Sequence, residues 1–279
     1  MIEKLRERWA SSGWGGHAGT DAWMLVYFGV LIGLYTKFDF LLGRIDVGLR
    51  SPVVEHPLFP AFFLNGKVAL VAYFLPMFAC ICLWRPSVIG RQVAALAVVV
   101  GSGTLLLHVE GYNDATFTTG LWVGLWLLWW AGCAETASVP SRDQAIFFGK
   151  AIVGLFFLVG TVGKLTSGYW DGTALYQIYF VQKGTPIFSF LRETFSEATL
   201  QTMAVYFSRA TVIMEGMLAT VLFWPLRWAA MAIMIMIAGM VVVSHVQLIS
   251  VVGPLFVLMV GLLRLGSMSS SSSPSIAAA

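Results

Sequence analysis

Long apolar runs separated by polar connections dominate the chain. Each run has about 16–22 residues, close to the roughly 20 that cross the hydrocarbon core of a bilayer as a helix. A helix is favoured over a strand because an open sheet edge leaves backbone groups unsatisfied in lipid. The pattern predicts an all-α, polytopic transmembrane helical bundle of about eight spans, without a soluble domain. The eight runs are residues 22–42, 66–84, 90–108, 115–133, 145–164, 203–224, 227–247 and 250–265.

The composition supports a membrane protein and argues against a nucleic-acid partner. Hydrophobic residues make up 58% of the chain and charged residues 11%, against about 45–50% and about 25% in soluble domains. The formal net charge of +3 is dispersed, with no run of Lys or Arg that would follow a phosphate backbone. Membrane lipids are therefore the expected surroundings.

The two ends of the chain are polar. Residues 1–21 precede a first run that is longer than the core of a signal peptide, so we expect a retained first span.

Connections on the side of the N-terminus carry nine Lys or Arg, against six on the other side, or eight with Lys37 and Arg209. This bias favours two cytoplasmic termini, in a bacterial inner membrane. Residues 266–279 are Ser-rich and predict a disordered tail.

Lys164 closes the run 145–164 and begins a polar, aromatic stretch that contains Trp170 and Asp171. Two interpretations remain open. The lysine stem can lie along the helix while the ammonium reaches lipid headgroups. Alternatively, the amine lies in a semi-dry pocket, where desolvation lowers its pKa and makes it available as a base. Trp170 and Asp171 would then gate that pocket.

Glu215 lies near the middle of the run 203–224, where a carboxylate is costly unless it is protonated or paired. Arg209 is six residues away, about 240° around a helix, and does not face it. The partner of Glu215 is therefore expected from another span. Its role is either a structural interhelical hydrogen bond or a part in proton transfer or substrate binding.

Other polar groups fall at the ends of runs on the same predicted side as Lys164. His108 and Asn113 follow the third run, and His245 and Gln247 lie at the end of the seventh. Interhelical hydrogen bonds and a shared binding pocket are both open. The histidines show no metal-ligand spacing, so no metal is expected.

A tryptophan stripe marks the fourth run. Trp122, Trp126 and Trp129 recur at helical spacing and so share one face. Such a stripe is typical of a lipid-facing or interfacial surface, while a groove for a flat ring such as a quinone is the functional alternative.

Four motifs in matching order resemble the horizontally transferred transmembrane (HTTM) family, the membrane part shared with vitamin K-dependent γ-glutamyl carboxylases. The first is the Gly-Lys-Leu-(x)4-Trp-Asp-Gly segment at 163–172. The others are the Asn-Asp connection at 108–114, the span with a central glutamate at 209–215, and the His-led segment at 245–256. Together they extend over about residues 20–265, which gives a predicted domain at 22–265.

The resemblance implies a quinol-dependent reaction. In the carboxylases, the lysine matching Lys164 is the base that deprotonates vitamin K hydroquinone, and oxygenation then produces a base strong enough to abstract a glutamate γ-proton. It implies a reduced quinone as cofactor, menaquinol or a vitamin K hydroquinone, and Lys164, His245 and Glu215 as the catalytic groups. The predicted pocket residues are His108, Asn113, Trp170, Asp171 and Gln247.

Departures from the family pattern leave other functions open. The carboxylases carry two consecutive lysines where this chain has Gly163 and Lys164, and the large luminal domain that binds the carboxylation substrate has no counterpart here. Protein carboxylation is therefore in doubt, and quinol chemistry on another substrate stays open. The alternative is a non-catalytic membrane subunit, scaffold or maturation factor with a membrane-protein or peptide partner. A proton-coupled transporter is disfavoured, because no pair of broken spans recurs in two halves.

Overall fold

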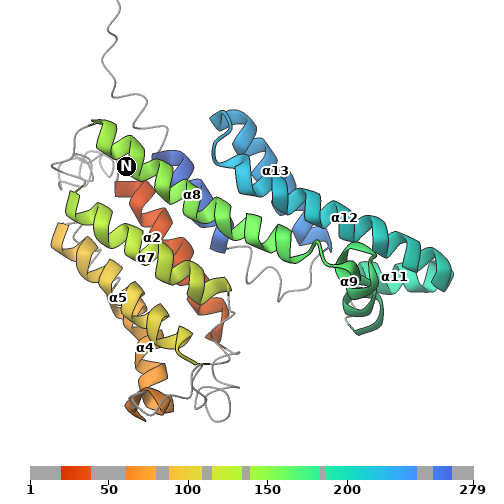
Figure 1. Cartoon of the computed structure of the whole chain (residues 1–279), viewed down its shortest axis with the longest axis horizontal. Helices are drawn as coiled ribbons and strands as arrows, with labels where there is room; N and C mark the ends of the chain where they lie inside the picture. The colour runs from red at the N-terminus through yellow and green to blue at the C-terminus, as the bar shows by residue number, and fades with distance from the viewer. Residues whose placement is uncertain are drawn as a thin grey trace, which may run out of the picture. The chain divides into compact units, whose positions relative to one another are not determined.

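The computed structural model describes residues 20–38, 61–79, 88–108, 115–133, 139–182, 186–243 and 254–265. These residues are helical and contain no β-strand, which confirms the predicted all-α class. Two compact units divide the chain (Figure 1): Met1–Gly149 with Val257–Ala279, and Lys150–Phe256. The predicted N-terminal segment, apart from its last two residues, and the predicted Ser-rich tail lie outside the described residues.

The first unit is built around α5, which packs against α4 on one side and α7 on the other (Figure 1). Buried phenols connect α2 to this group. Tyr27 on α2 donates a hydrogen bond to the Arg91 carbonyl of α5 at 2.6 Å, and Tyr73 on α4 donates to the Leu34 carbonyl of α2. A buried Tyr hydroxyl needs such a partner, because leaving it unpaired is costly. The elements are α2 (Thr20–Thr36), η1 (Ala61–Leu64), α4 (Gly66–Ala79), α5 (Val88–Leu106), α7 (Ala115–Cys133) and the first part of α8 (Val139–Gly163).

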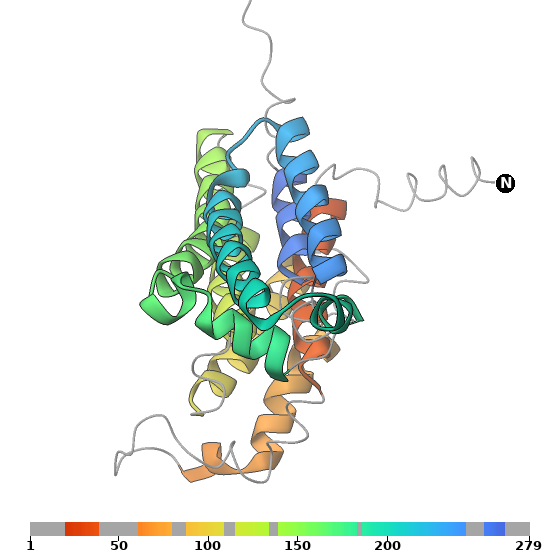
Figure 2. The same cartoon turned by 90° about the vertical axis from the view of Figure 1, so that its right-hand side faces the viewer.

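The second unit starts within α8 and contains a connection that folds into short helices (Figure 2). A turn through Pro225 joins its two longest later helices, α12 and α13. Pro225 suits this place because it lacks the amide hydrogen that a helix interior needs. After α8 the elements are α9 (Ser167–Trp170), α10 (Thr173–Leu175), the π-helical η3 (Tyr176–Gln182), α11 (Pro186–Thr194), α12 (Glu197–Val221) and α13 (Leu226–Val243).

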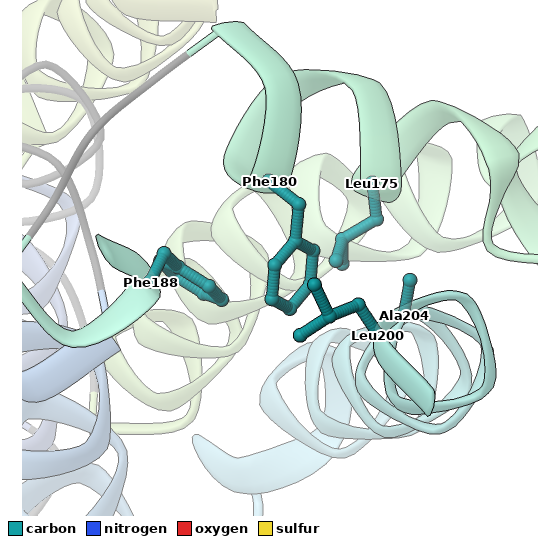
Figure 3. Close-up of a cluster of buried hydrophobic side chains, with 5 residues drawn as sticks. All are labelled: Leu175, Phe180, Phe188, Leu200 and Ala204. Carbon is teal, nitrogen blue, oxygen red and sulfur yellow. The ribbon is translucent and has the colours of Figure 1, made fainter. Parts of the chain in front are cut away.

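The connection has a small hydrophobic core of its own. Figure 3 shows Leu175 and Phe180 converging with Phe188 of α11 on two α12 side chains, Leu200 and Ala204. Phe180 and Phe188 meet edge to face, with ring centroids 4.9 Å apart, a favourable geometry for aromatic pairs. This core holds residues 173–191 against the first half of α12.

Each of the eight predicted runs contains a helix, and in the last one Pro254–Leu265 is helical. Among the described residues, two helices are long and apolar enough to cross a membrane: Ile89–Leu106 and Asp143–Gly163. The bundle of eight spans stays a prediction.

Candidate functional site at the end of helix α8

Lys164 forms an ion pair with Glu215 of α12. The lysine follows the last residue of α8, and its amide still closes the final turn through hydrogen bonds to the Gly160 and Thr161 carbonyls, at 3.2 and 3.1 Å. Its Nζ donates to Oε1 of Glu215. The two side chains are 31% and 16% exposed, respectively. The prediction that the partner of Glu215 lies outside its own helix is confirmed.

The second carboxylate oxygen of Glu215 is buried. Within the part of the chain that the structure describes, Oε2 has no hydrogen-bond partner. A buried ionised oxygen without a partner is costly. A proton on Oε2, or a hydrogen bond donated to it by a ligand, would remove this cost.

The stretch after Lys164 is fixed to α12 at two points. The Ser208 hydroxyl, which is buried, donates a hydrogen bond to the Tyr169 carbonyl. Gly172 adopts a left-handed conformation with φ of +83°, and a β-carbon there would lie 2.5 Å from the Val205 amide nitrogen. Only glycine fits this position at low cost. These contacts fix Tyr169 and Trp170 beside the ion pair.

Two cations of the site face aromatic rings. Lys164 Nζ lies 5.7 Å from the centroid of the Tyr169 ring, and the Arg209 guanidinium lies 5.4 Å from that of Trp170. Both distances are within the range of cation–π attraction. Arg209 therefore contacts α9, and the ion-pair partner of Glu215 is Lys164. This agrees with the helical spacing, which predicted that Arg209 does not face Glu215.

Two phenols in the connection are influenced by the same carboxylate. Burial raises the pKa of Tyr169 to about 12, helped by the negative charge of Glu215 and opposed by a hydrogen bond with Thr211. Burial followed by the Glu215 charge also raises the pKa of Tyr179. Because both shifts favour the neutral form, these hydroxyls remain hydrogen-bond donors at neutral pH.

Asp171 has a local role in the described structure. Its Oδ1 accepts a hydrogen bond from the Thr173 amide at 2.9 Å. Backbone and side-chain hydrogen bonds from Thr173 lower the pKa of Asp171. An Asp side chain that accepts a hydrogen bond from the amide two residues later stabilises a turn. Asp171 therefore stabilises the turn between α9 and α10. A gating role stays a prediction.

The predicted site residues divide into three groups. Lys164, Glu215, Trp170 and Asp171 belong to the arrangement above. His108 is buried at the end of α5 in the first unit. The remaining three lie outside the described residues, so their predicted convergence on this site stays a prediction: Asn113, His245 and Gln247.

The tryptophan stripe on α7 does not form one exposed surface. Trp122 and Trp129 are about half exposed, whereas Trp126 is buried and donates its indole N–H to the Ala145 carbonyl of α8 at 2.8 Å. Trp126 is the middle residue of the three, and α8 covers it. The expectation of a lipid-facing or interfacial surface therefore does not hold for Trp126.

Sequence reasoning did not single out Tyr169 and Ser208 as site residues. A signal for Ser208 was present: positions 204, 208, 212 and 215 follow helical spacing, and in the structure they line the side of α12 that the connection and α8 contact. Tyr169 had no comparable signal, because its position depends on tertiary contacts with α12, such as the hydrogen bond that its carbonyl accepts from Ser208.

Comparison with known proteins adds no family to this geometry: no family model, no curated protein and no solved structure matches the chain. Within the described ranges, no group of three or more His, Cys, Asp or Glu is placed to hold a metal ion. The groups that define the candidate site are therefore the Lys164–Glu215 ion pair and its aromatic neighbours.

Proposed function

We propose that this chain is a membrane-embedded, quinol-dependent enzyme of the HTTM and carboxylase-like class, in which Lys164 is the base. The observation that supports this proposal best is the ion pair between Lys164 and Glu215 at the end of the apolar helix Asp143–Gly163. A lysine base must lose its own proton before it can act. Glu215 is bonded directly to that ammonium and is the proposed acceptor.

Proton transfer within the pair would prime the base. The ammonium proton passes along the existing hydrogen bond to Glu215, giving a neutral amine and a neutral carboxyl. In surroundings of low dielectric constant this neutral pair avoids the desolvation cost of two charges. The buried Oε2 atom, which lacks a partner among the described residues, also becomes less costly once the carboxyl is protonated.

The primed amine would then accept the proton of an aryl hydroxyl. A reduced quinone supplies that hydroxyl together with two electrons, and dissolved oxygen is the electron acceptor in the proposed reaction. The Trp170 side chain, 38% exposed and next to Tyr169, offers an aromatic face for a flat ring. His245, His108, Asn113 and Gln247 remain proposed pocket groups.

The proposed setting is a bacterial inner membrane, with both termini in the cytoplasm and Lys164 at the opposite face. The weak excess of Lys and Arg on the side of the N-terminus supports this orientation. The two helices that are long enough to cross a bilayer support membrane insertion.

Replacing Lys164 tests the enzyme. Lys164→Ala should abolish oxygen-dependent oxidation of added menaquinol by the purified protein, while Lys67→Ala, which removes an exposed lysine from the first unit, should leave it unchanged. Because Lys164→Ala leaves Glu215 unpaired, Lys164→Met with Glu215→Leu serves as a second variant that restores neutrality. Wild-type oxidation by either folded Lys164 variant would disprove the proposal.

A non-catalytic subunit or maturation factor is the second candidate, and helix α11 favours it. Phe188 of α11 points into the small core, whereas Ile187 and Phe190 of α11 and Phe195, just beyond its end, are 38%, 62% and 42% exposed. An exposed apolar group of this kind is common at protein-binding surfaces. This alternative predicts a stoichiometric partner that co-purifies with the chain and is retained by Lys164→Ala.

A further inference from the structure

The ring of Tyr169 lies beside the amine of the proposed base. Its ring faces Lys164 Nζ at 5.7 Å from the centroid, and its phenol is close enough to Glu215 for the carboxylate charge to raise its pKa. The charged and titratable groups around this phenol are Lys164 and Glu215, together with Tyr179 of η3. A third polar group therefore lies beside the ion pair.

The backbone of Tyr169 is held from both directions. Its carbonyl accepts the Ser208 hydroxyl of α12, and its amide donates to the Thr166 carbonyl at 3.2 Å. Three residues later, Gly172 is in backbone contact with Val205. A side chain on so constrained a backbone loses little further freedom on binding a ligand, which is what a preorganised donor requires.

The Tyr169 phenol keeps its proton at neutral pH. Burial raises its pKa to about 12, and the Glu215 charge acts in the same direction. A neutral phenol cannot serve as the base, but it can donate a hydrogen bond to an oxygen that becomes negative. Placed beside an ammonium, such a donor is suited to an aryl oxygen that has just lost its proton.

We infer that Tyr169 is a catalytic hydrogen-bond donor, whose O–H binds the ligand oxygen that Lys164 deprotonates; this inference rests on the proposed function. In that step the ligand O–H bond breaks and an N–H bond forms on Lys164, so the electron pair stays on the ligand oxygen. The Tyr169 proton is shared with that oxygen but remains on tyrosine. No electrons leave the ligand in this step.

Tyr169→Phe isolates the hydroxyl, because the ring that faces Lys164 is retained. Loss of one donor to a developing oxyanion lowers kcat by about 100-fold, so menaquinol oxidation should fall by about that factor with KM unchanged. Tyr176→Phe is the matched control, since the Tyr176 hydroxyl lies 3.4 Å from Glu197 rather than beside the ion pair.

A second measurement uses 2-methyl-1-naphthol, a phenolic probe whose absorbance reports its ionisation. Wild-type protein should lower the pKa of the bound probe, and Tyr169→Phe should raise that value by about one unit, a tenfold change in the ionisation constant. Tyr169→3-fluorotyrosine, which keeps the hydroxyl and strengthens it as a donor, should lower it below wild type.

The outcomes separate this inference from the proposed function. Wild-type kcat and probe ionisation in Tyr169→Phe, with Lys164→Ala inactive, would overturn the donor role and leave the base in place. Weaker probe binding or unfolding in Tyr169→Phe, with 3-fluorotyrosine unchanged from wild type, would make Tyr169 structural and also overturn it. Full menaquinol oxidation by Lys164→Ala would overturn the proposed function itself.

Discussion

Gly160 of α8 lies against the carboxylate of Glu215 on α12. A β-carbon added to Gly160 would come within 3.4 Å of Oε2, the oxygen that Lys164 does not bind. Gly160 also precedes Lys164 by one helical turn, so both residues lie on the same side of α8. The absence of a side chain at 160 therefore leaves room for this carboxylate beside the end of α8.

A larger side chain at Gly160 should disrupt the ion pair. Gly160→Val places two further carbons against Oε2, and overpacking of this kind costs about 1–3 kcal/mol. Gly163→Val is the control at the same end of the helix, because no atom of the described residues lies within 4 Å of a β-carbon there, and it should change stability by no more than about 0.5 kcal/mol. Thermal unfolding in detergent measures both, and equal losses would contradict the contact.

Removing Lys164 should lower the free energy of unfolding more than removing Glu215. Lys164→Ala leaves the less exposed Glu215 without its partner and should cost about 3 kcal/mol, the lower end of the loss for broken buried pairs, because the Glu215 side chain is partly exposed. Glu215→Ala leaves a lysine that is 31% exposed and able to reach water, so about 1 kcal/mol is expected. The free energy of unfolding of each variant in detergent tests this order.

The double variant Lys164→Ala with Glu215→Ala completes the cycle. It removes both charges and should lose less stability than the two single variants together, because neither charge is left without its partner. A double variant as unstable as the sum of the two single variants would show that the ion pair contributes no coupling.

Docking of the connection onto α12 should depend on Gly172. In Gly172→Ala the residue must hold a φ near +83° while its β-carbon meets the Val205 backbone at 2.5 Å. Together, strain and steric conflict should cost about 3 kcal/mol. Gly168→Ala, whose β-carbon has open space, should stay within about 0.5 kcal/mol. Limited proteolysis of residues 165–175 should accelerate only in Gly172→Ala.

The hydrophobic pattern of the sequence predicts where the helices lie along the chain. It does not predict how the helices pack against one another. Residues 115–133 were expected as one helix and form one with those bounds. The spacing of its tryptophans also placed them on one face, typical of a lipid-facing or interfacial surface, but Trp126 is covered by α8 and donates its indole N–H to the Ala145 carbonyl of that helix. Periodicity assigns residues to a face of a helix, whereas the neighbour covering that face depends on tertiary contacts.

The candidate site was likewise predictable only in part. An unpaired carboxylate inside a membrane is costly, and helical geometry excluded Arg209 as the partner of Glu215, so the sequence predicted a partner from another helix. Selection of Lys164 as that partner needed the structure, since several polar groups ended runs on the same predicted side. Tyr169 could not be identified from the sequence, because its place beside the ion pair depends on tertiary contacts with α12, among them the hydrogen bond that its carbonyl accepts from Ser208.

Alkaline titration should show Tyr169 as a late-ionising phenol. The native pKa is raised to about 12, from an ordinary value of 10.0, so between these values the unfolded chain loses this proton while the native protein keeps it. The contribution of this group to stability is complete below pH 10 and is lost as the pH rises toward 12. Absorbance of wild type minus Tyr169→Phe at 295 nm should therefore show phenolate only near pH 12, and the Tm of wild type should fall more steeply above pH 10 than that of the variant. A Tyr169 difference titration centred on pH 10 would mean that the phenol is in water, away from Glu215.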